Sequence, residues 1–227
     1  MKKTITITIV VLIVLGLGYY LFKISPDQTQ QNTSTGYNAA LNTTSAKKIS
    51  EPPAFDPATD RYMGSASAKN TLVEYADFEC PACAAYSDML KQVPTVFKDT
   101  VFVFRYFPLT QIHPNTVESA MAAEAAGAQG KYWEMHDILF KNQSEWQSLS
   151  DPLNVFAQYA QSVGVPNADQ FKSDITNKKY LPKIQADSDQ ALGLNIPGTP
   201  SFFFNGHLLQ NADIAGMEKQ AEQYYNN

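Results

Sequence analysis

The sequence predicts an α/β domain in which a β-α-β unit and an α-β-β-α end are separated by a helical insertion. Residues 70–78 and 100–107 are rich in β-branched and aromatic side chains, and they flank a stretch with apolar residues at helical spacing. Residues 115–194 are helical in pattern throughout. Two short apolar runs then flank Asn205-Gly206, a dipeptide typical of a β-hairpin. The β-α-β unit implies a parallel pair of strands with a right-handed crossover.

The N-terminal residues predict a membrane anchor. Residues 4–22 carry no charged side chain and are mostly apolar. As a helix they would span roughly 28 Å, close to the ~30 Å hydrocarbon core of a bilayer. Lys2 and Lys3 precede them, so the N-terminus is expected in the cytoplasm and everything after Lys23 outside it. The alternative is a cleaved signal peptide, but its apolar region is shorter, and residues 18–22 offer no small-residue cleavage site.

Composition divides the chain into three expected segments. Residues 1–23 form the anchor. Residues 24–58 are rich in Gln, Asn, Thr, Ser and Pro and bury too little apolar surface to fold, so they form a flexible low-complexity linker. Residues 59–227 form one domain with a sizeable core, and its helical insertion covers about 114–180. The net charge of −5 and the lack of a basic run exclude nucleic acid as an expected partner.

Apolar spacing and capping residues predict the remaining helices. A helix is expected over residues 84–93, because apolar side chains recur there at helical spacing. Asn167 is expected to begin a further short helix. The helix over 180–194 is expected to end with Gly193 as its cap, and a helix over 212–224 closes the chain.

The chain contains only two cysteines, Cys80 and Cys83, whereas a structural disulfide framework shows four or more. At the N-terminus of a helix, free N–H groups and the helix dipole would stabilise a Cys80 thiolate. Cys83, one turn further on, is close enough to resolve a mixed disulfide. The alternatives are an inert bridge and a zinc half-site, although His113, His136 and His207 show no ligand spacing. Neither a metal nor a cofactor is expected beyond the redox-active disulfide itself.

Several motifs occur in order within residues 60–225. They are VEYADFECPAC at 73–83, FPL at 107–109, HP at 113–114, GKYW at 130–133 and GTPSF at 198–202. Together they resemble the DsbA-like thiol–disulfide oxidoreductases. The resemblance implies a thioredoxin-like core interrupted by a helical domain, which agrees with the predicted element order. It also implies a protein-disulfide oxidoreductase that introduces disulfides into secreted or surface proteins, and a membrane partner linked to quinones that reoxidises it. A monomer is expected.

The resemblance assigns roles to three positions besides the cysteines. Pro200 matches the family's cis-proline, which faces the disulfide and presents its backbone to a substrate peptide; the alternative is an ordinary trans turn. Thr199 would then lie beside Cys80, where its hydroxyl can tune the thiolate. Glu74 matches a buried acid beneath the active site, whose raised pKa would let it relay the proton of Cys83. The alternative for Glu74 is a solvated carboxylate on a strand.

One departure from the family pattern, together with a nearby negative charge, predicts a weaker oxidant than the family's strongest members. Strong oxidants carry a histidine between the cysteines, where this chain has Ala82. Glu79 adds a negative charge beside Cys80, which works against the thiolate. His113 could line the active-site face, but a role in the loop or as a cap is the expected one.

Two competing functions stay open at this point. The first is a disulfide reductase or isomerase of the same fold, although residues 25–58 look too unstructured to supply the dimerisation domain of an isomerase. The second is a tethered binding module whose disulfide is only structural.

Overall fold

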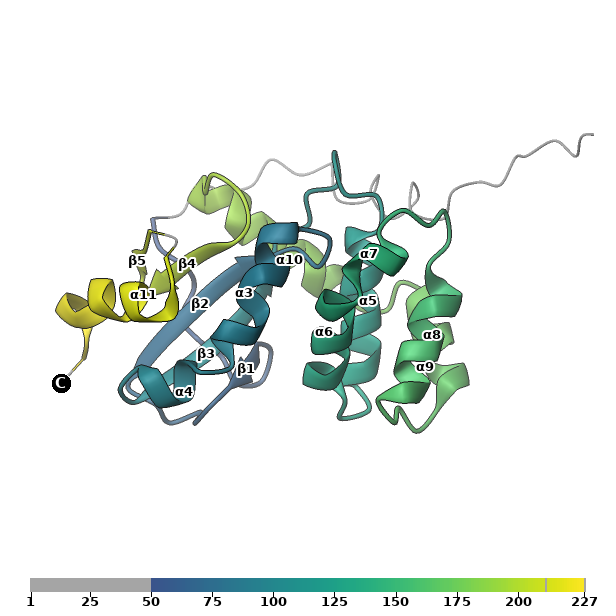
Figure 1. Ribbon diagram of the computed structural model, residues 1–227, viewed down its shortest axis with the longest axis horizontal. Helices are drawn as coiled ribbons and strands as arrows, with labels where there is room; N and C mark the ends of the chain where they lie inside the picture. Colours follow the sequence, from purple (N-terminus) through teal and green to yellow (C-terminus); the bar gives the residue numbers. More distant parts are fainter. Residues whose placement is uncertain (1–49, 211, 227) are drawn as a thin grey trace, which may run out of the picture. The chain divides into compact units, whose positions relative to one another are not determined.

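A β-sheet forms the centre of the fold in a computed structural model of the protein, which describes residues 50–210 and 212–226 (Figure 1). The strand order among these residues is β1-β3-β2-β4-β5. Strands β2 and β3 run parallel, and the other neighbouring pairs run antiparallel. The strands are β1 Arg61–Met63, β2 Asn70–Ala76, β3 Thr100–Tyr106, β4 Ser201–Phe204 and β5 His207–Leu208. The predicted parallel pair and the predicted hairpin are therefore confirmed.

The two central strands are almost completely buried, which explains their β-branched and aromatic sequences. Side chains alternate between the two faces of a strand. Leu72 and Ala76 belong to the core cluster that also holds both cysteines, whereas Val73 and Tyr75 belong to a second cluster. Glu74 lies between Leu72 and Ala76 in this alternation. Its side chain therefore points to the side of the sheet on which the cysteines lie.

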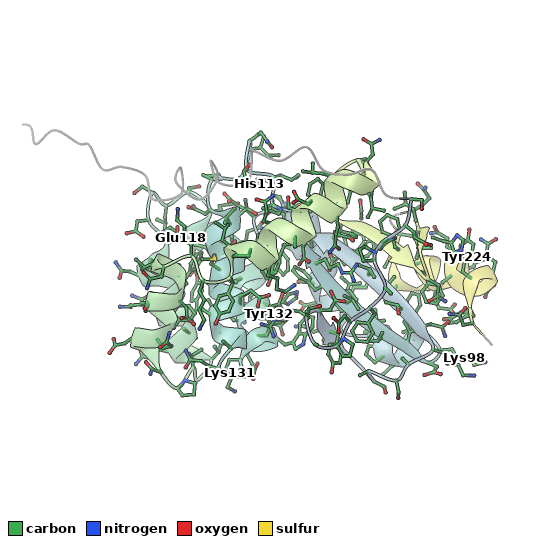
Figure 2. All side chains as sticks on the ribbon, turned by 180° about the vertical axis from the view of Figure 1, so that it is seen from behind. Lys98, His113, Glu118, Lys131, Tyr132 and Tyr224 are labelled. Atoms are coloured by element: carbon green, nitrogen blue, oxygen red, sulfur yellow. The ribbon has the colours of Figure 1, made fainter. Side chains whose placement is uncertain are left out.

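Helices cover both faces of the sheet. Helix α3, Pro81–Leu90, lies in front of the strands in Figure 1, and α10, Leu181–Leu194, passes behind them. The view from behind in Figure 2 shows α10 crossing over the strands. Two further helices are α4, Val93–Val96, and α11, Ile214–Ala221, and a 3₁₀ turn, Glu222–Tyr224, follows α11.

The segment between β3 and β4 is helical, as the sequence predicts. Before α10 it forms α5 Thr116–Gly127, α6 Tyr132–Lys141, α7 Gln143–Trp146, α8 Leu153–Ser162 and α9 Ala168–Thr176. In Figure 1 these helices gather on one side of the sheet. Every residue of α5 except its last is buried, and its many alanines let the neighbouring helices approach closely. Helix α5 therefore forms the centre of the insertion.

The predicted membrane anchor, residues 4–22, and most of the predicted linker lie outside the described residues. Within residues 50–210 and 212–226, no helix has the length and apolar character needed to cross a bilayer. The described end of the linker is held by Arg105 of β3. This guanidinium is 2% exposed, pairs with Asp60 through Nε and Nη2 at 2.9 Å each, and donates to the carbonyl oxygens of Pro53 and Ala54. Contacts with the sheet thus begin ahead of the boundary expected between residues 58 and 59.

Two local features differ from the sequence prediction. Strand β1 was not expected, because its three residues are too few to show the alternation that marks a strand; it pairs with β3 across the register Arg61↔Phe104. Gly193 does not cap α10. It is buried inside the helix, and Asn195 ends the helix in the left-handed conformation with a φ of 52°. Asparagine is one of the few residues that adopt this conformation readily.

Candidate active site

Cys80 lies where strand β2 gives way to helix α3. It is the N-cap residue of α3, with φ −76° and ψ 120°, and Pro81 occupies the first helical turn. Proline suits this position because its fixed φ fits the helix. An N–H group at this position would have no hydrogen-bond partner within the helix, so proline loses nothing by lacking one. Both cysteines are free thiols in the structure. Cys80 is 6% exposed and Cys83 is fully buried, so only Cys80 can be reached from solvent.

The surroundings of Cys80 favour its thiolate. The hydrogen bond from the Cys83 thiol is the largest of the effects that lower the pKa of Cys80 from 9.0 to about 5. Burial opposes this shift, while the Thr199 side chain and the backbone N–H groups of Ala82 and Cys83 reinforce it. The thiolate expected at the start of the helix is therefore supported by the geometry of the site.

Cys83 has the opposite tendency. Burial raises its pKa well above 9.0, and the hydrogen bond to Cys80 and the negative charge of Glu74 raise it further. One cysteine is thus accessible and easily ionised, and the other is inaccessible and held as a thiol. Such a pair has one point of attack and one resolving group.

Thr199 and Pro200 come from the loop before β4, and Thr199 contacts Cys80. The peptide bond between them is cis, as the sequence predicts. The Cys80 thiol donates a hydrogen bond to the Thr199 carbonyl oxygen, with 3.4 Å between sulfur and oxygen. The Thr199 hydroxyl is buried and has no partner among the described residues. Ionisation of Cys80 provides that partner, because a thiolate accepts a hydrogen bond; this explains why the Thr199 side chain lowers the pKa of Cys80.

Glu74 is buried, with 1% of its surface exposed, and it interacts electrostatically with both cysteines. Burial raises its pKa well above the ordinary 4.5, and the negative charge of Cys80 raises it further. Its carboxylate also acts on Cys83, whose pKa it raises. The structure therefore agrees with a buried acid at this position and disagrees with the solvated carboxylate that the sequence left open.

Asp77 and His113 form a second polar group beside Cys80, which the sequence did not predict. The Asp77 side chain is fully buried, and His113 Nδ1 lies 2.7 Å from its Oδ2. Asp77 also accepts hydrogen bonds from the backbone of Leu109 and Glu79 and from the Thr116 hydroxyl. The only signal in the sequence is the HP pair at residues 113–114, and no local pattern connects it with Asp77.

Glu79, which the sequence predicts as a negative charge beside Cys80, is buried in the structure. Its side chain is buried at 4% exposure, and Oε2 accepts a hydrogen bond from the backbone N–H of Asn115 at 2.7 Å. Burial raises the pKa of Glu79 to about 7. Near neutral pH the carboxyl is therefore only partly ionised, and it opposes the Cys80 thiolate less than a full charge does.

Comparison with known proteins identifies the family. The sequence matches the family model described as thioredoxin over residues 56–223. This chain belongs to the thioredoxin family. In the described part of this thioredoxin-family protein, no cluster of three or more histidine, cysteine, aspartate or glutamate side chains is placed to hold a metal ion.

Solved structures share the same fold. BdbD from Bacillus subtilis superposes with a TM-score of 0.67 at 21% identity and covers 79% of this chain and 98% of its own. The thiol-disulfide exchange protein alpha-DsbA2 from Wolbachia pipientis has a TM-score of 0.63 at 19% identity, over 74% and 88%. MdbA, a thiol-disulfide oxidoreductase from Corynebacterium diphtheriae, has a TM-score of 0.59 at 20% identity, over 78% and 95%. The resemblance to DsbA-like proteins is confirmed at the level of the fold.

Curated relatives of higher identity are much longer proteins. The Na(+)/H(+) antiporter NhaA 1 of Salinispora arenicola is 38% identical over 151 residues, which are 66% of this thioredoxin-family chain and 22% of the antiporter. The Na(+)/H(+) antiporter NhaA of Herminiimonas arsenicoxydans is 28% identical over 197 residues, or 86% and 28%. The chain thus spans about a fifth to a quarter of the length of these relatives.

Proposed function

We propose that this thioredoxin-family protein is a thiol–disulfide oxidoreductase that introduces disulfides into secreted or surface proteins outside the cytoplasm. The observation that carries the proposal is the contrast between the two cysteines: Cys80 is accessible and has a pKa lowered to about 5, whereas Cys83 is buried and held as a thiol. A stabilised thiolate in the reduced form is the property of a strong oxidant. The proposal is supported by the similar folds of alpha-DsbA2, a thiol-disulfide exchange protein, and of MdbA, a thiol-disulfide oxidoreductase.

The proposed reaction begins with the oxidised Cys80–Cys83 disulfide. A substrate thiolate attacks the sulfur of Cys80, a bond forms between the substrate and Cys80, and Cys83 leaves with the electron pair. Glu74 gives the buried Cys83 thiolate its proton. A second substrate thiolate then attacks the substrate sulfur of the mixed disulfide, and Cys80 leaves as a thiolate. The substrate gains a disulfide, and the enzyme is left with the reduced pair.

The low pKa of Cys80 serves the second step directly, because a thiol of low pKa is a good leaving group. We propose that Pro200 presents its backbone to the substrate peptide, since the neighbouring Thr199 carbonyl oxygen already lies 3.4 Å from the Cys80 sulfur. By family resemblance, a membrane partner linked to quinones accepts the two electrons and restores the disulfide. A reductase is the competing function, and the stabilised Cys80 thiolate disfavours it.

The chain is proposed to work from the membrane, with residues 1–23 as its anchor and 24–58 as its tether. The apolar sequence of residues 4–22 supports this. The similarity to a relative named as a Na(+)/H(+) antiporter is consistent with a location at a membrane. Antiport itself is not proposed, because the chain matches only 22% of the length of that antiporter. The full chain is expected to sediment with membranes in high salt, and a variant lacking residues 1–23 to stay in the supernatant. Recovery of the full chain in the supernatant would contradict the anchor.

The reduction potential of the full chain, equilibrated in glutathione buffers, tests the proposed activity. A value above roughly −170 mV is expected, because such a potential lets the enzyme give disulfides to secreted proteins. A value near the −270 mV of thioredoxin would instead make the chain a reductase. A disulfide still intact below about −300 mV would mean a structural bridge and would reject the catalytic proposal.

A further inference from the structure

A cationic group near Cys80 has to come from outside the active-site motif. The two residues between the cysteines are proline and alanine, which carry no charge. Glu74 and Glu79 are acids, so any charge they carry opposes the thiolate. His113, from the loop between β3 and α5, is an ionisable cation that interacts electrostatically with Cys80, and both residues contact Asp77.

Asp77 fixes the position of His113. The Asp77 carboxylate lies three residues before Cys80, and its backbone oxygen accepts the Cys80 N–H at 3.0 Å. His113 Nδ1 lies 2.7 Å from Asp77 Oδ2, and the imidazole is 15% exposed. The same carboxylate oxygen accepts the Leu109 N–H at 2.9 Å, and Leu109 O in turn accepts the His113 N–H at 3.0 Å. The loop is thus closed on Asp77, and the histidine has little freedom to turn away.

The surroundings of His113 favour its charged form. Burial acts to lower the pKa of His113, but the hydrogen bond and the charge of Asp77 outweigh it, and Glu79 and the Cys80 thiolate contribute in the same direction. The net result is a raised pKa, so the imidazole carries a positive charge over a wider pH range than a free histidine. The interaction with Cys80 is mutual: a thiolate that favours the imidazolium is itself favoured by it.

We propose that His113, held by Asp77, is a positioning residue whose positive charge stabilises the Cys80 thiolate and so raises the reduction potential of the Cys80–Cys83 pair. The inference rests on the proposed function, since it concerns how strongly the same pair oxidises. Reduction takes up two electrons and one proton when Cys80 ends as a thiolate and Cys83 as a thiol. A charge that stabilises only that reduced form makes the oxidised enzyme a stronger oxidant.

The sign of the pH dependence follows from the two ionisations. The effect needs a Cys80 thiolate, so it begins above about pH 5, and it needs an imidazolium, so it ends above the raised pKa of His113. The groups that face His113 are Asp77, Glu79 and Cys80. The extra oxidising strength is therefore expected near pH 6, and it is expected to fade as pH rises through the raised pKa of His113.

The test compares the full-length protein with His113→Gln, whose amide can still donate a hydrogen bond to Asp77 but carries no charge. Titration of the thiolate absorbance near 240 nm is expected to show that the variant raises the pKa of Cys80 by about half a unit, or threefold in the ionisation constant; the effect is this small because water screens a partly exposed charge. A threefold change in equilibrium lowers the reduction potential by about 14 mV. As pH rises through the raised pKa of His113, the reduction potentials of the variant and the wild type are expected to converge.

His207→Gln is the matched control. His207 lies on the edge strand β5 and stacks on Tyr224 at 3.9 Å between ring centroids, and Figure 2 shows Tyr224 well apart from His113. This variant is expected to keep the wild-type thiolate pKa and potential. A His113→Gln variant that keeps the wild-type thiolate pKa and the wild-type potential at pH 6, or whose potential is lowered equally below and above the raised pKa of His113, would overturn the proposal in favour of a purely structural role.

A second measurement needs no folded variant. The chain has three histidines, so the ring resonance of His113 can be followed by NMR in the oxidised and the reduced full-length protein. The pKa of His113 is expected to be about half a unit higher in the reduced protein, where it faces a thiolate. Equal values in both states would overturn the inference even if the potential lies above −170 mV. A pKa of His113 that differs between the oxidised and the reduced protein would uphold the inference even if the reduction potential lies far below about −170 mV. The proposed function and the proposed role of His113 can therefore fail independently of each other.

Discussion

Replacement of Cys80 with serine is expected to reduce disulfide formation in a reduced protein substrate to the background rate, a loss of more than about 10³-fold. A serine hydroxyl cannot form the disulfide that is passed on, and Cys83 cannot take its place. Cys83 is fully buried, and burial together with the neighbouring Cys80 and Glu74 raises its pKa well above 9.0. The measurement is the appearance of native disulfides in the substrate, followed by recovery of its activity.

Cys83→Ser is the matched control, because it keeps the accessible cysteine and removes the resolving one. It is also expected to be inactive in turnover, but its Cys80 thiolate should capture oxidised glutathione as a stable mixed disulfide, visible as a mass increase. Cys80→Ser should form no such adduct. Equal adducts in the two variants would contradict the assignment of Cys80 as the point of attack. A Cys80→Ser strain with an intact cellular role would favour the binding module instead.

The path from sequence to structure was direct where neighbouring residues decide the outcome. Cys80 lies at the start of a helix because a β-rich run leads into the motif and Pro81 suits the first turn. The Asn205-Gly206 turn joins β4 to β5, with positive φ at both residues as this hairpin type requires. The cis bond before Pro200 was expected from the family motif, since local chemistry alone favours trans.

Features that depend on residues far apart in the chain were missed. His113 lies 36 positions from Asp77, and nothing in either local sequence indicates the hydrogen bond between them. Glu79 was expected to be a charge that opposes the thiolate, but the Asn115 N–H, also 36 positions away, binds its carboxylate in a buried site. Strand β1 forms by pairing with the edge of β3 that faces away from β2. Long-range partners of this kind decide burial, and burial decides charge.

Glu74→Gln is expected to slow disulfide transfer by about 10²-fold, the lower end of the range for a lost proton-transfer group, at pH values below the raised pKa of Glu74. Burial, reinforced by the charge of Cys80, raises the pKa of Glu74 well above 4.5, so the wild-type carboxyl keeps its proton to a higher pH than an exposed glutamate does. It can give that proton to Cys83 as Cys83 leaves the disulfide. Glutamine has the same shape but no proton to give. The rate of formation of the mixed disulfide, measured by stopped flow, is the relevant quantity.

The difference between wild type and Glu74→Gln is expected to shrink as pH rises through the raised pKa of Glu74. Above it, the wild-type carboxylate has no proton to donate, and its charge opposes the Cys83 thiolate. Glu118→Gln is the matched control: Glu118 is also a buried acid, with a pKa raised to about 7 by burial and by Asp151. It is expected to leave the rate unchanged. A Glu74→Gln rate equal to wild type at all pH values would remove the relay.

Stability separates this role from a folding defect. A carboxyl whose pKa is raised by folding is protonated in both the folded and the unfolded state below about pH 4.5. Its ionisation therefore does not lower the free energy of unfolding in that range. As pH rises, the unfolded chain loses this proton first, and the folded state becomes relatively less stable. Glu74→Gln removes that penalty, so denaturant unfolding should show the variant gaining stability over wild type as pH rises from about 4.5 toward the raised pKa of Glu74. If the variant is more stable than wild type and yet reacts more slowly, the loss of rate comes from the chemical step, because no weakening of the fold can account for it.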